Sequence, residues 1–253
     1  MSNERLRVDR DREILRVTLT RPERHNAFDA ALIRELADAF AGVGDARAVV
    51  LAGEGPSFCA GADVEWQRSS IDLTYDENLE DYRRLYRMFE AIFRCPAPVV
   101  ARVHGYVLGG GCGVTACADI AIAAEDAVFG FSEVRLGIMP AVISPWVLAK
   151  IGPAAVRRYF LTGERFDAET ALRIGLVDEV AADADAAVDR VVDDLLAGGP
   201  TAVREAKRLA LEPGDEDELV VRAAAQRTGD EGQEGLRAFL EKRPPAWLSG
   251  SSS

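Results

Sequence analysis

Near its middle the chain reads His104-Gly105-Tyr106-Val107-Leu108-Gly109-Gly110-Gly111-Cys112-Gly113. The three consecutive glycines open a run of small residues that predicts a helix over 109–118. The first N–H groups of such a helix have no partner within it and lie at the positive end of its dipole, so they can hold an oxyanion. Tight helix packing is the alternative explanation. Dinucleotide binding is a third, because Gly111-x-Gly113-x-x-Ala116 fits the loose G-x-G-x-x-A pattern, but this run lies outside the first βα unit.

Two other segments carry functional signals. The small residues of Ser57-Phe58-Cys59-Ala60-Gly61-Ala62-Asp63 follow a predicted buried strand and let backbone N–H groups approach a ligand closely. In the segment 129–140, Glu133 lies among apolar residues. If Glu133 is buried, its pKa rises, which suits proton transfer near neutral pH. Taken singly, the first segment is better explained as an ordinary glycine-containing loop, and Glu133 as a solvated glutamate or one paired with Arg135.

Strands and helices alternate up to about residue 140, and helices dominate afterwards. This order predicts an α/β core with a helical C-terminal layer. The predicted strands cover 14–19, 46–51, 99–103 and 120–123, with a short one from 128. The predicted helices cover 30–40, 74–93, 109–118, 154–161, 168–173, 184–196, 201–211, 216–228 and 231–242.

Composition excludes several classes of protein. The 253 residues are 48% hydrophobic, which suffices for a sizeable core, but no apolar run reaches the length of a membrane span. The polar start predicts no secretory signal, and the four cysteines and two histidines lack the spacing of a metal site. A net charge of −12 argues against binding to nucleic acid. We therefore expect a cytoplasmic protein with free thiols and with no metal, membrane or nucleic-acid partner.

In their order along the chain, the motifs resemble those of the crotonase superfamily, also called the enoyl-CoA hydratase/isomerase family. The resemblance covers nearly the whole sequence. It rests on 21–28 (Arg-Pro-Glu-Arg-His-Asn-Ala-Phe), 58–63, 105–112, 117–120 (Cys-Ala-Asp-Ile), 129–133, 161–163 (Leu-Thr-Gly), 171–177 and 239–243 (Phe-Leu-Glu-Lys-Arg).

This resemblance implies an α/β fold of the crotonase type, a spiral of ββα units with a helical C-terminal layer that builds trimers. We expect a spiral core over residues 1–195 and a helical oligomerisation region over 196–253. The implied assembly is a homotrimer or a dimer of trimers. The implied substrate is an acyl-CoA thioester, with coenzyme A as its carrier and no other cofactor.

The resemblance also assigns roles to single residues. The backbone N–H groups of Ala62 and Gly110 are expected to form an oxyanion hole for the thioester enolate, with Glu133 as the catalytic carboxylate. The expected CoA-binding residues are Arg24, His25, Ala60, Asp63, Phe239 and Lys242. Phe239 and Lys242 match tail positions that often reach the CoA of a neighbouring subunit. Asp63 has an alternative role as the cap of the helix that follows it.

Two departures from the family's pattern affect the reaction. Well-known hydratases carry a first glutamate where this chain has Gly113, so Glu133 alone remains, as in the family's Δ3,Δ2-enoyl-CoA isomerases. Conversely, the segment 141–146 (Ala-Val-Ile-Ser-Pro-Trp) resembles hydratase-like members linked to methylglutaconyl-CoA and related branched substrates. We expect hydration of a 2-enoyl-CoA, with isomerisation, decarboxylation and non-catalytic acyl-CoA binding as alternatives. A Gly113→Glu change is expected to restore the missing partner.

Overall fold

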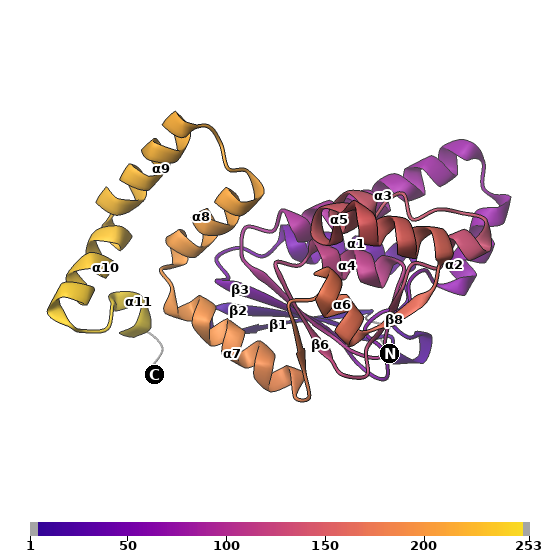
Figure 1. The fold of residues 1–253 in the computed structure, drawn as a ribbon, viewed down its shortest axis with the longest axis horizontal. Helices are drawn as coiled ribbons and strands as arrows, with labels where there is room; N and C mark the ends of the chain where they lie inside the picture. Colours follow the sequence, from indigo (N-terminus) through magenta and orange to yellow (C-terminus); the bar gives the residue numbers. More distant parts are fainter. Residues whose placement is uncertain (1–4, 250–253) are drawn as a thin grey trace.

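A six-stranded sheet forms the centre of the molecule in the computed structural model, which describes residues 5–249 (Figure 1). The strand order is β1-β2-β3-β4-β6-β9. The first pair is antiparallel and the other pairs are parallel. The strands span Leu6–Asp11 (β1), Ile14–Leu19 (β2), Ala48–Gly53 (β3), Val99–Val103 (β4), Ile120–Ala124 (β6) and Glu179–Ala181 (β9).

Helices cover both faces of this sheet, as expected for parallel strands that read as continuous apolar runs. In β3, Val49 and Leu51 belong to the main core, to which α1 (Ala30–Ala41) and α3 (Tyr75–Phe93) contribute. Val50 points to the opposite face and packs with residues of α7 (Ala184–Ala197). The central part of the sheet is therefore buried on both sides.

A second, smaller sheet makes the chain a spiral. It consists of β5 (Tyr106–Leu108), β7 (Val128–Gly130) and β8 (Arg165–Asp167) in the order β5-β7-β8. The chain passes from β4 in the large sheet to β5 in the small one and then into α4 (Gly110–Cys117). It repeats this path through β6, β7 and α5 (Ser144–Thr162). These repeated ββα turns confirm the predicted crotonase-type α/β fold.

The C-terminal helices extend away from the sheets along the long axis of the molecule (Figure 1). They are α8 (Pro200–Leu211), α9 (Glu216–Thr228), α10 (Asp230–Glu241) and the short α11 (Ala246–Ser249). The carboxylate of Glu231 in α10 accepts the N–H groups of Thr201 and Ala202 at 2.8 Å, which fixes α10 to the start of α8. The expected helical layer is present, and the boundary expected at 195/196 falls two residues before the end of α7. The outermost residues of the two expected regions, 1–4 and 250–253, lie outside the described part of the chain.

Most predicted elements are present, but several bounds were wrong. The strand expected at 46–51 spans 48–53, and the helix expected at 154–161 is the second half of α5, which is kinked at Gly152 (φ 72°) before Pro153. The sequence patterns did not predict β1, β5, β8, β9 or α2 (Val64–Ser69), because these elements are short or largely exposed. No helix between residues 5 and 249 is long and apolar enough to cross a membrane.

Candidate active site

Two loops expected to supply the oxyanion donors are joined by backbone hydrogen bonds. The N–H of Cys59 donates to the carbonyl of Tyr106 at 3.1 Å, and the N–H of Leu108 donates to the carbonyl of Cys59 at 2.9 Å. The first loop is also paired with Phe28. The N–H of Phe28 donates to the carbonyl of Gly61 at 2.7 Å, and the carbonyl of Phe28 accepts the N–H of Asp63 at 2.8 Å. These bonds bring the segments around residues 28, 61 and 109 together.

The same pairing leaves two N–H groups unused. In the parallel bridge to Phe28, the neighbours of Ala62 carry the bonds, so the N–H of Ala62 itself points the other way. Gly110 is the first residue of α4, where an N–H has no partner inside the helix. Within residues 5–249 neither group donates a hydrogen bond, and both residues line one pocket. The structure thus brings the two predicted donors into the same cavity.

Close packing around Gly110 and Gly61 explains why these positions carry no side chain. A methyl group added at Gly110 would lie 2.6 Å from Cε2 of Phe28. Gly61 has a φ of 94°, and a methyl group there would lie 3.1 Å from the carbonyl oxygen of Leu108. Larger residues would force the two loops apart and separate the donors.

Glu133 begins the short 3-10 helix Glu133–Leu136 and lies against the glycine turn. A methyl group added at Gly109 would lie 3.1 Å from its Oε1. Its Oε2 is buried and has no hydrogen-bond partner among the described residues. Burial raises the pKa of this carboxyl group, as a proton-transfer residue requires. Of the apolar residues around Glu133, Phe131 is fully buried, but Leu136 and Ile138 are 61% and 45% exposed and line the pocket.

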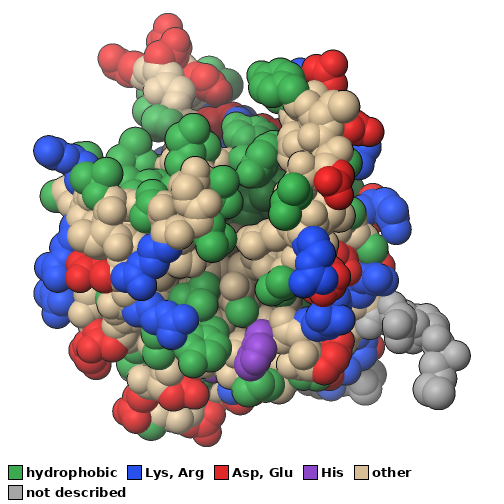
Figure 2. Space-filling model, turned by 90° about the vertical axis from the view of Figure 1, so that its right-hand side faces the viewer, with side chains coloured by type: hydrophobic (Ala, Val, Ile, Leu, Met, Phe, Trp, Pro, Cys, Tyr) green, Lys and Arg blue, Asp and Glu red, His purple; other side chains and the backbone are tan. Residues whose placement is uncertain are grey.

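The pocket itself has a volume of about 650 Å³. Figure 2 shows a hollow lined by hydrophobic side chains on the face of the molecule at the α2 end, with Lys, Arg and His side chains on the surface below it. The other carboxylate in the lining, that of Asp81, has protein partners. It accepts Nε1 of Trp66 at 3.3 Å and Nη1 of Arg84 at 3.3 Å. Glu133 is therefore the lining carboxylate with an unpartnered oxygen.

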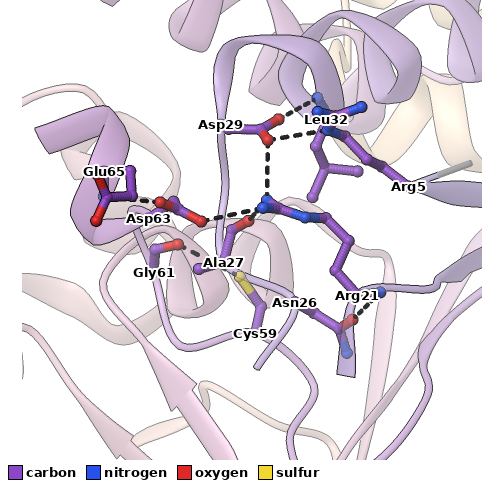
Figure 3. A network of polar contacts seen from close by, with 10 residues as sticks. All are labelled: Arg5, Arg21, Asn26, Ala27, Asp29, Leu32, Cys59, Gly61, Asp63 and Glu65. Carbon is purple, nitrogen blue, oxygen red and sulfur yellow. Dashed lines mark hydrogen bonds and ion pairs between the residues drawn. The ribbon is translucent and has the colours of Figure 1, made fainter. Parts of the chain in front are cut away.

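Asp63 lies next to the pocket but is used structurally. Its carboxylate caps α2 by accepting the N–H of Glu65 at 2.8 Å, and it pairs with Nη2 of Arg21 at 3.1 Å (Figure 3). Arg21 in turn donates to the carbonyl of Ala27 at 2.8 Å and pairs with Asp29 at 3.1 Å. Asp63 is absent from the pocket lining, so the structure gives it the alternative capping role and does not bring its carboxylate to the expected CoA path.

The other expected CoA-binding residues fall into two groups. Ala60 lines the pocket, and its N–H donates to the carbonyl of His25 at 2.9 Å, which places His25 and the exposed Arg24 beside the pocket. Phe239 and Lys242 lie in and just after α10, at the opposite end of the long axis from α2 (Figure 1). One chain therefore does not bring Lys242 and Arg24 together.

The space beside Gly113 is filled, which the sequence did not indicate. A methyl group added at Gly113 would lie 2.4 Å from Cγ2 of Ile143 and 2.9 Å from Cε1 of Phe89. Phe89 in turn packs against Trp146 with ring centroids 5.7 Å apart. The expectation that Gly113→Glu alone restores a second carboxylate is therefore wrong, because the new side chain would overlap Ile143.

Comparison with known proteins agrees with this geometry. The family model described as Enoyl-CoA hydratase/isomerase matches residues 9–250. The chain belongs to the enoyl-CoA hydratase/isomerase family. It is therefore an enzyme of that family, which implies an acyl-CoA substrate.

Individual members of the enoyl-CoA hydratase/isomerase family match over almost their full length. A relative from Rhodobacter capsulatus named "Probable enoyl-CoA hydratase" is 37% identical over 256 residues, which cover 97% of this chain and 98% of that protein. The crotonyl-CoA hydratase of Syntrophomonas wolfei is 31% identical over 262 residues, covering 98% and 100%. The crystal structure of an enoyl-CoA hydratase from Shewanella pealeana superposes with a TM-score of 0.91 at 36% identity and covers 97% of both chains.

Replacing Ala62 by proline tests the oxyanion assignment in this family member. Proline removes the N–H that is expected to hold the enolate oxygen, and loss of one such donor costs about 2.7–4 kcal/mol in the activation barrier. We expect Ala62→Pro to lose at least about 100-fold in kcat, measured by steady-state kinetics on an acyl-CoA substrate. Ala62→Gly keeps the N–H and serves as the control. A folded Ala62→Pro enzyme with full activity would disprove the assignment.

A second prediction concerns stability and pH. Because burial raises the pKa of Glu133 in the folded protein above its unfolded value, folding favours the protonated carboxyl group. The associated stabilisation is fully present below the unfolded pKa of about 4.3 and is lost as the pH rises through the folded pKa. We expect Glu133→Gln to raise Tm relative to wild type at pH 7 to 8, with the difference shrinking towards about pH 4. Thermal melts of the exposed control Glu125→Gln should show no such trend.

Proposed function

We propose that this enzyme adds water to the double bond of a 2-enoyl-CoA thioester and that Glu133 alone handles the protons. The observation that carries the proposal is the position of Glu133, which has a buried, unpartnered Oε2 and lines the same pocket as Ala62 and Gly110, whose N–H groups are free among the described residues. A base and an oxyanion hole on one cavity are the two components that enolate chemistry requires.

The steps balance with one carboxylate. Ionised Glu133 takes a proton from water as the oxygen attacks C3. The π electron pair of the C2–C3 double bond then forms a C1–C2 double bond, and the π pair of the thioester carbonyl moves to its oxygen, which gives the enolate. The N–H groups of Ala62 and Gly110 stabilise that oxygen. Protonated Glu133 then gives the same proton to C2, so hydrogen and hydroxyl add to one face. This route uses no metal or redox cofactor, and coenzyme A serves as the carrier.

Isomerisation of the double bond is the second candidate, and one observation favours it. Phe89 and Ile143 occupy the space beside Gly113, so a water molecule cannot be held there by a second carboxylate. A single base that carries a proton between C2 and C4 needs no such water. The names of the relatives, which are hydratases, support hydration as the first choice. Decarboxylation would use the same oxyanion hole, but no contact in the pocket favours it.

Glu133→Gln tests the mechanism. The amide keeps the size of the side chain and removes the base, so we expect kcat to fall about 100-fold to 10,000-fold while acyl-CoA binding persists. The measurement is loss of enoyl thioester absorbance for hydration, with calorimetry for binding. Product formed in D₂O should carry deuterium at C2 and a hydroxyl at C3 if the enzyme is a hydratase.

The outcomes separate the candidates. A shifted double bond without a hydroxyl group identifies an isomerase. Loss of carbon dioxide from a carboxylated acyl-CoA by a Glu133→Gln enzyme with wild-type kcat would overturn the single-glutamate mechanism. A panel that includes crotonyl-CoA, longer straight-chain enoyl-CoA and branched methylglutaconyl-like thioesters tests the acyl group suggested by the segment 141–146.

We further propose that the C-terminal helices assemble the enzyme into trimers or pairs of trimers. Large apolar side chains are exposed on α9 and α10: Val220 (63%), Val221 (66%), Phe239 (81%) and Leu240 (77%). Such surface is normally covered by a partner. Assembly of this kind would also allow Phe239 and Lys242 to reach the CoA site of a neighbouring subunit.

Light scattering measures this assembly directly. We expect the mass of three or six chains for wild type and a smaller mass for Leu240→Asp, because a charge is costly to bury at an apolar interface. The control Val8→Asp on the edge strand β1 should keep the wild-type mass. A wild-type monomer at working concentration would contradict the proposal.

A further inference from the structure

The guanidinium group of Arg21 bonds two segments of the chain behind the pocket (Figure 3). Its Nη1 donates to the carbonyl of Ala27 at 2.8 Å and lies 3.1 Å from Oδ2 of Asp29. Its Nη2 donates to Oδ2 of Asp63 at 3.1 Å. One side chain therefore ties the segment 27–29 to the end of the loop that carries the first expected oxyanion donor.

The three acceptors of Arg21 flank the backbone bridge that directs this donor. The first two stand on either side of Phe28, and the third follows Ala62. The peptide between Gly61 and Ala62 is planar, so its C=O and its N–H point in opposite directions. Because the N–H of Phe28 holds that C=O at 2.7 Å, the direction of the Ala62 N–H depends on how the two segments lie against each other.

Each of the two carboxylates divides its oxygens between a helix and Arg21. Oδ1 of Asp29 caps α1 by accepting the N–H of Leu32 at 2.8 Å, and Oδ1 of Asp63 caps α2 at the same distance. The Oδ2 atoms of both carboxylates pair with Arg21. The starts of α1 and α2 are thereby fixed to one cation.

These charges are shielded from water. The side chains of Arg21 and Asp63 are 14% and 5% exposed. The main chain of Arg21 is fixed by the fully buried Asn26, whose Oδ1 accepts its N–H at 2.8 Å and whose own N–H donates to its carbonyl at 2.9 Å. Without the cation, the two carboxylates would repel each other in a place where little water screens them. Loss of Arg21 is therefore expected to displace Asp63 and the residue before it.

We propose that Arg21 is a positioning residue for the reaction, because its bonds to Ala27, Asp29 and Asp63 hold the N–H of Ala62 in the direction that enolate binding requires. Arg21 is absent from the pocket lining, so it acts through the main chain and not on the substrate. The inference rests on the proposed function, since it requires Ala62 to be an oxyanion donor. Such a donor is effective when its orientation is fixed before the charge develops, and a small displacement is costly.

Steady-state kinetics on an enoyl-CoA, run well below the Tm of each variant, test this role. Arg21→Met keeps the stem and removes the guanidinium group, so we expect kcat to fall roughly 10-fold to 100-fold. KM should stay within about twofold of wild type, because the donor acts mainly in the transition state. Arg21→Lys keeps a charge between the two carboxylates and so preserves folding, but one ammonium group cannot reach all three acceptors, and kcat should again fall. Arg5→Met is the matched control, since it removes another cation bonded to Asp29, at 2.9 Å, and should keep the wild-type kcat.

A double-mutant cycle distinguishes positioning from a general loss of structure. In the Ala62→Pro enzyme the donor is already missing, so adding Arg21→Met should lower kcat by less than about a further twofold. If Arg21→Met does not fold, Arg21→Lys takes its place in both measurements.

Each outcome decides the matter. Losses that multiply in full in the double variant would show that Arg21 acts elsewhere and would overturn the inference. Wild-type kcat in a folded Arg21→Met or Arg21→Lys enzyme would overturn it as well, with the proposed function left standing. If Ala62→Pro alone keeps full kcat, the oxyanion assignment of the proposed function fails, and the inference fails with it.

Discussion

Backbone hydrogen bonding between two loops is the constraint on which this site depends. Cys59 pairs with Val107, and Ala62 pairs with Phe28. These pairings use the neighbouring amides, so the N–H groups of Ala62 and Gly110 have no acceptor among the described residues. Gly61 and Gly110 allow the approach because no side chain fits between the loops. The buried Arg21–Asp63 pair and the cap on α2 hold the first loop from behind. The same loop pairing that closes the spiral therefore also forms the site.

The electrostatics follow from this geometry. Glu133 is placed against the glycine turn, where one oxygen has no partner and burial raises its pKa. An ionised carboxylate in such a place is destabilising and reactive, which is common at catalytic positions. Phe89 and Ile143 fill the space beside Gly113, and the other carboxylate in the lining, Asp81, is bonded to Trp66 and Arg84. The mechanism we propose accordingly uses one proton carrier and one oxyanion hole.

Sequence patterns predicted the parts of the fold that have strong periodicity. The strands at 14–19 and 99–103 and the long helix α3 were found because their apolar residues alternate or repeat over enough positions. Strand β1 was missed because five of its six residues are exposed and most are charged. The glycine motifs located the oxyanion loops, but no pattern could indicate that Ile143 fills the space at Gly113 or that Arg21 pairs with Asp63, because both contacts join residues far apart in the chain.

The donors at residues 62 and 110 belong to the main chain and have a consequence for how this enzyme can change over generations. A codon change at residue 62 replaces a side chain but keeps the amide, unless it introduces proline. Residue 110 also keeps its amide on substitution, but it has to stay glycine because a side chain there would overlap Phe28. The proposed donor at residue 62 is therefore the one protected from most point mutations. Carboxylates such as Glu133 have no such protection and can be lost, gained or moved singly. Descendants of such a gene would diverge in which bond they make or break long before they lost the ability to hold an enolate.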